Sequence, residues 1–248
     1  MKPIEQIKQE IAQSDGLLIA AANGFSIAEG FAILMPTAWF DEQFSDFVRK
    51  YGFRAPIQAL SYPYPSEEDF NTLFSRMVSL IHYDKPVSPL MKDLQKITEN
   101  HPAFILTTNS EDRFEQAGYP ARDVFYLEGR MTHRKDGSFI AREELPLIRS
   151  AADLETDQYV GSSSFQEGMQ RLERFIRIHP RLLILELGVG QQNQLIRPLL
   201  FQIMDLLPQA RMAILNQSAA IVPFRYQNRV IEVQGSLTSL ITDLAYAR

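Results

Sequence analysis

The sequence predicts an α/β protein in which helices cover both faces of a parallel β-sheet. Short apolar segments that have the character of buried strands recur along the chain, and amphipathic segments with helical periodicity separate them. A helix is the usual connection between two parallel strands, because the chain must cross back over the sheet. Ligands bind beyond the carboxyl ends of the strands in such sheets, so a functional site is expected there.

Composition narrows the class of protein further. A chain of 248 residues suits one large domain, or one core domain with a smaller insert. Hydrophobic residues make up 45% and charged residues 22%, which argues against disorder. The net charge of −5, without a long basic run, argues against binding to nucleic acid or to an anionic membrane. No apolar run approaches the roughly 18 residues of a membrane span, and the first residues do not resemble a signal peptide.

The cysteine and histidine content limits the chemistry. Cysteine is absent, which excludes disulfides, a catalytic thiol and thiolate zinc sites. The four histidines are far apart in sequence, and none shows a recognisable arrangement with a nucleophile and a carboxylate. They are His82, His101, His133 and His179. We expect structural roles for all four, and a cytoplasmic protein without a metal.

The first third of the chain predicts a helix, a strand and further helices. Isoleucines at helical spacing follow Pro3, a favourable first-turn residue. Residues 16–22 form an apolar strand, after which Ser26 can cap a helix. The further helices are expected at 41–50, 66–80 and 87–99, and a proline-rich loop is expected at 54–65.

The rest of the chain predicts alternating strands and helices around one charged insert. Residues 129–160 are charged and weakly periodic, which indicates a partly irregular insert. The strands are expected at 103–107, 123–127, 181–187, 211–215 and 230–233. The helices are expected at 111–117, 164–178, 195–207 and 237–246.

A stretch of small residues, Ala20–Ser26, leads from the first strand into the next helix. Small side chains let backbone N–H groups approach a phosphate, and a helix N-terminus adds partial positive charge. The turn lacks the full G-x-G-x-x-G pattern, so close packing of the strand against the helix explains it equally well.

Polar residues follow several other strands. Residues 107–112 carry three hydroxyls, an amide and two carboxylates, although a helix cap by Asn109 or Ser110 explains this cluster better when it is taken alone. Glu128 fits a base, an acceptor of a hydrogen bond from a sugar hydroxyl, or an exposed loop acid. Asn216 fits either a ligand of a ribose hydroxyl or a turn residue.

Taken together, these motifs resemble the sirtuin family, in the same order and along nearly the whole chain. Residues 16–30 are similar to the family's first strand, small-residue turn and helix, and residues 104–109 with 114–118 resemble its second motif. Residues 125–129 resemble the strand that normally ends in the catalytic His-Gly. The stretches similar to the family's cofactor-binding tail are 188–190, 214–216 and 234–235. The stretches that favour class M, the macrodomain-linked bacterial branch, are 47–52, 62–68 and 185–190.

The resemblance implies a Rossmann-like core, a DHS-type NAD/FAD-binding domain, that holds NAD. This core comprises residues 1–30, 87–128 and 164–248, and a small helical, zinc-free module comprises 31–86 and 129–163. The implied catalytic residues are Asn109, Glu111 and Glu128. The implied contacts to NAD or ADP-ribose are Ala21, Ala22, Asn23, Gly24, Ser26, Asn109, Gly188, Val189, Gly190, Asn216, Gln217, Gln234 and Gly235.

The resemblance also implies an activity and its partners. Family members cleave the nicotinamide–ribose bond of NAD, and ordinary sirtuins pass the ADP-ribosyl group to an acyl-lysine and so deacylate proteins. Class M members transfer ADP-ribose to a lipoylated carrier protein and act alongside a macrodomain hydrolase. A protein substrate of this kind and a macrodomain partner are therefore expected.

Several residues depart from the family pattern. Ala20 and Ala22 replace two glycines, Glu111 replaces an aspartate, and the four zinc cysteines are missing. Glu128 takes the place of the catalytic histidine, which is a glutamine in class M. This position therefore lacks an imidazole base for deacylation. A carboxylate still suits ribosyl transfer, because it can bind ribose hydroxyls and stabilise a developing oxocarbenium charge.

Three functions are compatible with these observations. The polar groups at Asn109, Glu111 and Glu128 favour an NAD-dependent ADP-ribosyltransferase or an NAD glycohydrolase. The replaced glycines and the missing zinc cysteines favour a degenerate homologue that binds NAD or ADP-ribose without turnover. Lysine deacylation is the third function, and Glu128 disfavours it.

Overall fold

The computed structural model describes residues 2–246 and places six strands of this range in one sheet. The strand order is β3-β2-β1-β4-β5-β6, and every neighbouring pair is parallel. The strands are β1 (Gly16–Ala21), β2 (Ala103–Thr107), β3 (Val124–Tyr126), β4 (Leu182–Leu187), β5 (Arg211–Asn216) and β6 (Val230–Gln234). The predicted α/β class with a Rossmann-like parallel sheet is confirmed.

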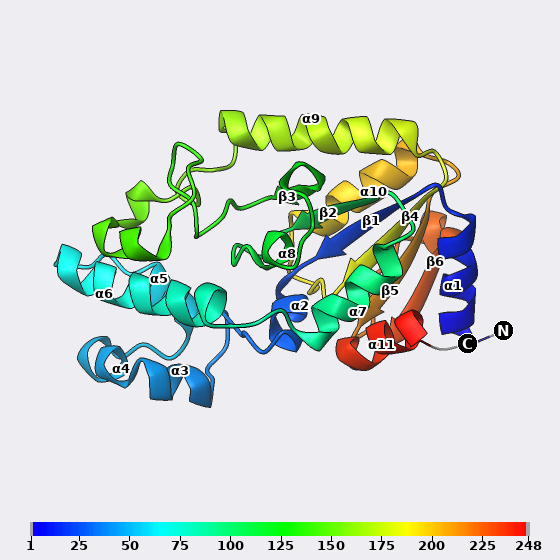
Figure 1. Cartoon of the computed structure of the whole chain (residues 1–248). Coiled ribbons are helices and arrows are strands. Elements are labelled where there is room, and N and C mark those ends of the chain that lie inside the picture. Colours follow the sequence, from blue (N-terminus) through cyan, green and yellow to red (C-terminus); the bar gives the residue numbers. More distant parts are fainter. Residues whose placement is uncertain (1, 247–248) are drawn as a thin grey trace.

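Helices cover both faces of this sheet, as predicted (Figure 1). On one face lie α1 (Pro3–Gln13), α2 (Asn23–Ala28), α7 (Pro89–Thr98) and α11 (Leu237–Tyr246). On the other face lie α9 (Ser163–Ile178) and α10 (Ile196–Leu206). The remaining helices are α3 (Ala38–Gln43), α4 (Ser45–Tyr51), α5 (Pro56–Leu60), α6 (Glu67–Val78) and the short α8 (Arg113–Gln116). A π-helical turn, Ser79–Tyr83, extends α6.

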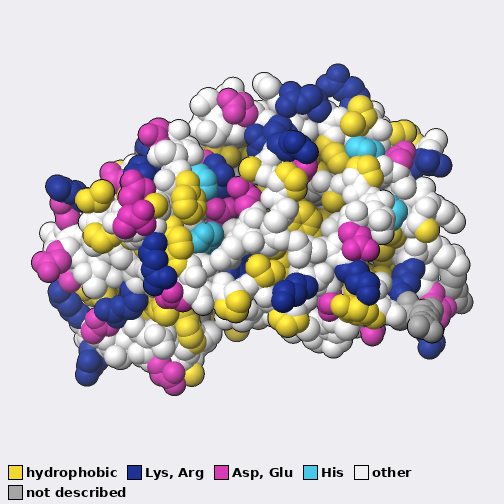
Figure 2. Space-filling model, in the orientation of Figure 1, with side chains coloured by type: hydrophobic (Ala, Val, Ile, Leu, Met, Phe, Trp, Pro, Cys, Tyr) yellow, Lys and Arg dark blue, Asp and Glu magenta, His cyan; other side chains and the backbone are white. Residues whose placement is uncertain are grey.

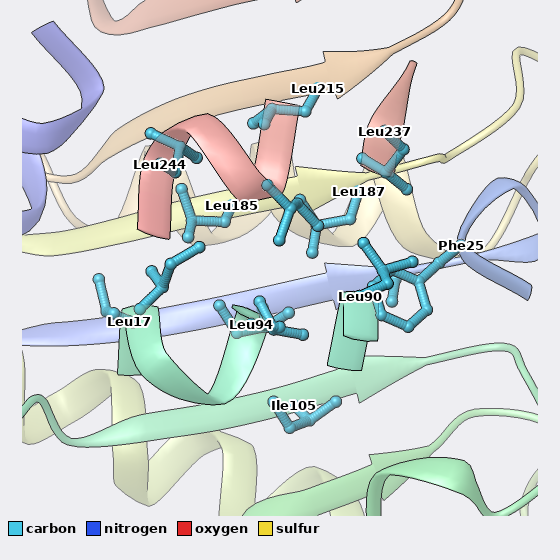
Figure 3. Packing of buried hydrophobic residues seen from close by; sticks show 14 of the residues in the cluster. Leu17, Phe25, Leu90, Leu94, Ile105, Leu185, Leu187, Leu215, Leu237 and Leu244 are labelled. Carbon is cyan, nitrogen blue, oxygen red and sulfur yellow. The ribbon is translucent and has the colours of Figure 1, made fainter. Parts of the chain in front are cut away.

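Each strand buries alternate side chains in two different cores, because successive side chains point to opposite faces of a sheet. Leu17 and Ile19 of β1 pack with α7 and α11, whereas Leu18 and Ala20 pack with α9 and α10. Figure 3 shows the first of these cores, in which Leu17, Leu185 and Leu215 from three strands meet leucines of α7 and α11. This two-sided burial explains why the strands are continuous apolar runs in the sequence.

A third core lies away from the sheet. It is rich in phenylalanine and joins residues 31–81 to residues 131–154, two stretches that are distant in sequence. Figure 1 shows α3–α6 grouped at one end of the molecule, with irregular segments of 129–160 packed against α6. We propose that this core defines the small module, and the name is used for it below.

Two predicted elements of the small module are wrong. The single helix expected at 41–50 is two helices, because Phe44 leaves the helical conformation (φ −125°) and packs its buried ring against Trp39 and Phe40. The loop expected at 54–65 contains α5, which begins at Pro56. Proline there is a first-turn residue rather than a helix breaker. The partly irregular insert is observed as predicted, with short 3₁₀ helices at Arg142–Leu147 and Ala151–Asp153.

The chain reverses its winding direction between β1 and β4, and the two turns that follow these strands touch through their backbones. The Gly24 N–H donates to the Gly188 carbonyl oxygen at 2.9 Å. A Cβ atom added to Gly24 would lie 2.6 Å from that oxygen, and one added to Gly188 would lie 2.6 Å from the Phe25 nitrogen. Gly188 also has a φ of +63°, which disfavours any residue with a side chain. Glycine is therefore required at both positions.

Replacing Gly188 by alanine should lower the free energy of unfolding by about 2–4 kcal/mol, since both the left-handed backbone and the overlap with the Gly24 turn are unfavourable. Gly190→Ala is the matched control, because no atom lies within 4 Å of an added Cβ at Gly190. Its effect should stay within about 0.5 kcal/mol. Urea unfolding of both variants measures the difference, and equal stabilities would show that the contact imposes no such constraint.

Candidate functional site

A cleft of about 650 Å³ opens between the carboxyl ends of β1, β2 and β3 and the small module. One wall is polar and comes mainly from the turns after β1, β2 and β3. It contains Asn23, Asn109, Glu111 and Glu128, which come from three separate stretches of the sequence. The other wall is largely apolar and comes from the small module, with Ile33, Ile57, Phe70, Phe74 and Leu154 among its residues. The structure thus brings the three predicted catalytic residues to one cavity.

The side chain of Asn109 is fixed against the end of β1. Its Nδ2 donates to the Ala22 carbonyl oxygen at 3.1 Å, and its backbone N–H donates to the Thr107 hydroxyl at 3.0 Å. That hydroxyl in turn donates to the Ala21 carbonyl oxygen at 2.9 Å. Asn109 is nine-tenths buried, so this hydrogen bonding gives it one defined orientation at the floor of the cleft.

The alternative that Asn109 or Ser110 caps a helix is wrong. The helix α8 begins only at Arg113, after Asp112, which has a left-handed backbone (φ 58°). The buried carboxylate of Asp112 accepts hydrogen bonds from Tyr126 and Thr132, at 2.9 and 2.8 Å. These two bonds hold the unusual backbone of Asp112 and leave the polar cluster before it to face the cleft.

Ser26 does not cap a helix, which corrects the prediction. It lies inside α2, which begins directly after Ala22, and its hydroxyl donates to Glu111 Oε1 at 2.8 Å. Glu111 is 4% exposed, and its Oε2 has no partner. Burial raises the pKa of Glu111, and the hydrogen bond from Ser26 opposes this effect. The carboxyl also borders a small cavity of about 20 Å³, which is about the size of one water molecule.

Glu128 follows β3 and is one of the residues that line the cleft. It is an exposed residue, so solvent reaches its side chain. Partial loss of hydration raises the pKa of Glu128 above its ordinary value. A carboxylate with incomplete hydration interacts more strongly with a positive charge that appears beside it.

The predicted contacts after β4, β5 and β6 lie on the same edge of the sheet but do not line this cleft. They are connected to one another: Asn216 Nδ2 donates to the Val189 carbonyl oxygen at 2.8 Å, and the Gly235 N–H donates to the Asn216 carbonyl oxygen at 2.9 Å. Gln217 follows Asn216 and donates its N–H to the Asn216 side chain. Gly190 and Gln234 complete this group of predicted contacts. Whether they bind NAD stays a prediction.

The turn after β1 offers fewer free donors than its small residues suggest. The N–H groups of Ala22, Gly24 and Phe25 donate to the carbonyl oxygens of Leu187, Gly188 and Ala22 respectively. In this conformation a phosphate beside the turn would depend on other donors. The smallness of these residues is explained in part by the close packing that was the alternative interpretation.

Sequence reasoning missed Arg197 and Asn193. Arg197 forms a buried ion pair with Glu186 at 2.6 Å and also donates to the Val189 carbonyl oxygen at 2.9 Å. A glutamate within the apolar run 182–187 was the available signal, because a buried carboxylate needs a partner. Asn193 lines the cleft and accepts the Ile196 N–H at the start of α10. Its position just before a predicted helix was the signal there.

Neither a possible metal centre nor a possible membrane-spanning helix is found among residues 2–246. Among residues 2–246, no group of three or more His, Asp or Glu side chains could hold a metal ion. No helix in the same range is long and apolar enough to cross a membrane. On the face shown in Figure 2, basic and acidic side chains are interspersed over the small module. The expectations of a metal-free protein that binds no nucleic acid stay predictions.

Comparison with solved structures identifies the fold as that of the sirtuins. A sirtuin studied for its substrate affinity superposes with a TM-score of 0.65 and 13% identity, with 98% of both chains covered. A complex of a Sir2 homologue with NAD has a TM-score of 0.64 and 15% identity, covering 97% of this chain and 92% of that one. The expected sirtuin fold is therefore confirmed.

A sequence comparison adds one relative whose name states an enzymatic activity. The chain is 26% identical, over 274 aligned residues, to a protein ADP-ribosyltransferase of Staphylococcus aureus (strain Mu50 / ATCC 700699). The alignment covers 97% of this chain and 86% of that relative. No family model matches the chain.

Removing the Ser26 hydroxyl should raise the pKa of Glu111 further, because the bond to Ser26 stabilises the charged carboxylate. Titration of the glutamate side-chain carboxyl signals by NMR in wild type and Ser26→Ala measures this shift. Glu144, whose pKa is lowered by its bond to the Ala141 N–H, should titrate identically in both proteins. An unchanged Glu111 titration would contradict the assigned interaction.

Proposed function

We propose that this protein is an NAD-dependent ADP-ribosyltransferase that cleaves the nicotinamide–ribose bond. The observation that carries the proposal is the convergence of Asn109, Glu111 and Glu128 on one cleft beside the strand crossover of a sirtuin fold. The name of the Staphylococcus aureus relative, a protein ADP-ribosyltransferase aligned over 97% of this chain, supports it.

NAD is the substrate that fits these positions best. Ligands of doubly wound sheets occupy the crevice at the point where the strand order reverses, which here lies between β1 and β4. We place the adenosine half over the turns after β4, β5 and β6, where Asn216 offers a side-chain amide. The nicotinamide ribose then lies in the polar part of the cleft, next to Asn109 and Glu128.

In this arrangement Asn109 and Glu128 have distinct parts in the reaction. Asn109 holds the ribose or a water molecule in place, since its amide is itself fixed to Ala22. Breaking the bond between the ribose carbon and nicotinamide leaves positive charge on the ribose, while the electron pair departs with nicotinamide. The Glu128 carboxylate stabilises that charge and accepts hydrogen bonds from the ribose hydroxyls. Glu111 lines the same cleft and accepts a hydrogen bond from Ser26.

The acceptor of ADP-ribose would enter along the apolar wall of the small module. We propose a protein side chain with a long apolar stem, which agrees with the lipoylated carrier protein expected from the class M resemblance. The macrodomain partner and the cytoplasmic location rest on the sequence alone and stay proposals. Lysine deacylation is disfavoured, because none of the four histidines lines the cleft.

Binding of NAD or ADP-ribose without turnover is the second candidate. The specific observation in its favour is the end of β1 and the turn after it, where Ala20 and Ala22 replace glycines and several N–H groups are already bonded. A homologue with such a turn would keep the NAD-binding pocket but lose the catalytic activity. The two candidates differ in whether nicotinamide is released.

Changing Glu128 to glutamine should lower nicotinamide release by about 10²–10³-fold while changing the Kd for NAD less than about threefold. The carboxylate acts on a charge that develops mainly in the transition state, so its loss affects kcat. Nicotinamide release measures the rate, and calorimetry measures binding. Glu173→Gln, an exposed change on α9, is the matched control and should retain full activity.

The same assay separates the candidate functions. Asn109→Ala should also abolish turnover while the protein stays folded. Increased activity in Glu128→Gln would identify Glu128 as an inactivating residue, since class M has glutamine there. Negligible release by both the wild type and Glu128→Gln would favour the binding module instead.

A further inference from the structure

The turn that carries Glu128 is fixed at Arg130, two residues further along the chain. The Arg130 N–H and Nε both donate to Glu155 Oε2, at 2.8 and 2.9 Å, and Nη2 donates to Oε1 at 2.9 Å. A carboxylate that receives both arms of a guanidinium is held in a defined geometry. Glu155 is 4% exposed, so water competes little for these bonds.

Gly129, the residue between Glu128 and Arg130, lets this turn lie close to the segment that contains Glu155. Gly129 has a φ of +76°, and a Cβ atom there would lie 3.0 Å from the Glu155 carbonyl oxygen and 3.1 Å from the Tyr159 ring. The turn therefore packs directly on the backbone of the segment that contains Glu155. No room remains for the turn to move toward that segment.

The other side of the turn is fixed as well. The Met131 N–H donates to the Ser110 carbonyl oxygen at 2.9 Å, next to Asn109 and Glu111. The chain around Glu128 is thus held between the turn after β2 and the segment around Glu155. Loss of either attachment would let the Glu128 carboxylate change direction within the cleft.

Glu155 also borders the far wall of the cleft. The residues that follow it, Thr156, Gln158, Tyr159 and Val160, line the same cavity as Glu128. Glu155 itself is not among the lining residues, and its N–H donates to the His133 carbonyl oxygen at 2.9 Å. Glu155 therefore acts on the catalytic residues through Arg130 and does not touch a substrate bound in the cleft.

We infer that Glu155 is a positioning residue, which orients Glu128 toward the reacting ribose through Arg130. This inference rests on the proposed function, since it concerns the direction of the same carboxylate. The adenosine half of NAD lies over other turns, so Glu155 governs the rate of bond cleavage and not the affinity for NAD. The pair also ties the direction of Glu128 to the wall formed by 156–160, along which an acceptor would lie.

Glu155→Gln tests the assignment, because it replaces one carboxylate oxygen by an amide nitrogen that faces the donors of Arg130. We expect kcat for nicotinamide release to fall by about 10–100-fold, the size of effect typical of residues that orient the ligands of a metal site. The KM for NAD should change less than about threefold. Glu167→Gln, an exposed change on α9 near the same polar surface, should leave both constants unaltered. An unaltered kcat in folded Glu155→Gln would overturn the inference.

A double variant separates positioning from a general structural effect. If Glu155 acts through Glu128, then Glu128→Gln with Glu155→Gln should lose no more activity than Glu128→Gln alone. Two losses that multiply would overturn the inference. If Glu155→Gln does not fold, Arg130→Lys serves instead, since it keeps the backbone N–H bond to Glu155. That variant should lose kcat but not NAD affinity, and full kcat would be contrary to the inference.

Failure of the proposed function would be recognised separately. A wild type that releases no nicotinamide contradicts the proposed activity, and the positioning role is then tested by hydrogen exchange. Glu155→Gln should accelerate exchange of the Arg130 and Met131 amides by about tenfold or more relative to the strands. Unchanged exchange in residues 128–131 would overturn the positioning role, whatever the activity.

Discussion

The backbone contact between Gly24 and Gly188 is the constraint on which the site depends. It joins the turn after β1 to the turn after β4 at the point where the chain reverses its winding direction. Because neither residue can carry a Cβ atom, the two turns approach as closely as backbones can. The direction of α2 follows from this contact, and with it the place of Ser26 opposite Glu111.

Further hydrogen bonds fix each of the two turns that meet at this contact. On one side Asn109 bonds to Ala22, and on the other Arg197 bonds to Val189. The buried pair of Arg197 and Glu186 adds little net stability in general, because desolvation offsets the attraction, although removing one partner typically costs about 3–5 kcal/mol. Its evident role here is to hold the carbonyl of the turn that also receives Asn216.

Periodicity and turn residues predicted the sheet, its covering helices and the strand ends, because each strand buries both faces and each long helix buries one. They could not predict partners that lie far apart in sequence. The sequence around Ser26 predicts a helix cap, whereas its partner in the fold, Glu111, is 85 residues away. The roles of Arg197 and Glu155 likewise depend on contacts that only the fold creates. Phe44 broke a predicted helix because the core of the small module requires its ring.

If the proposed function is right, the turns joined at Gly24 and Gly188 form one site for NAD and its ADP-ribose part. Calorimetric titration of ADP-ribose into the wild-type protein and into Asn216→Ala tests this site. We expect saturable binding of one ligand per chain, weakened about tenfold or less in the variant, as expected for one or two lost hydrogen bonds. No heat and no thermal shift at millimolar ADP-ribose or NAD would contradict it.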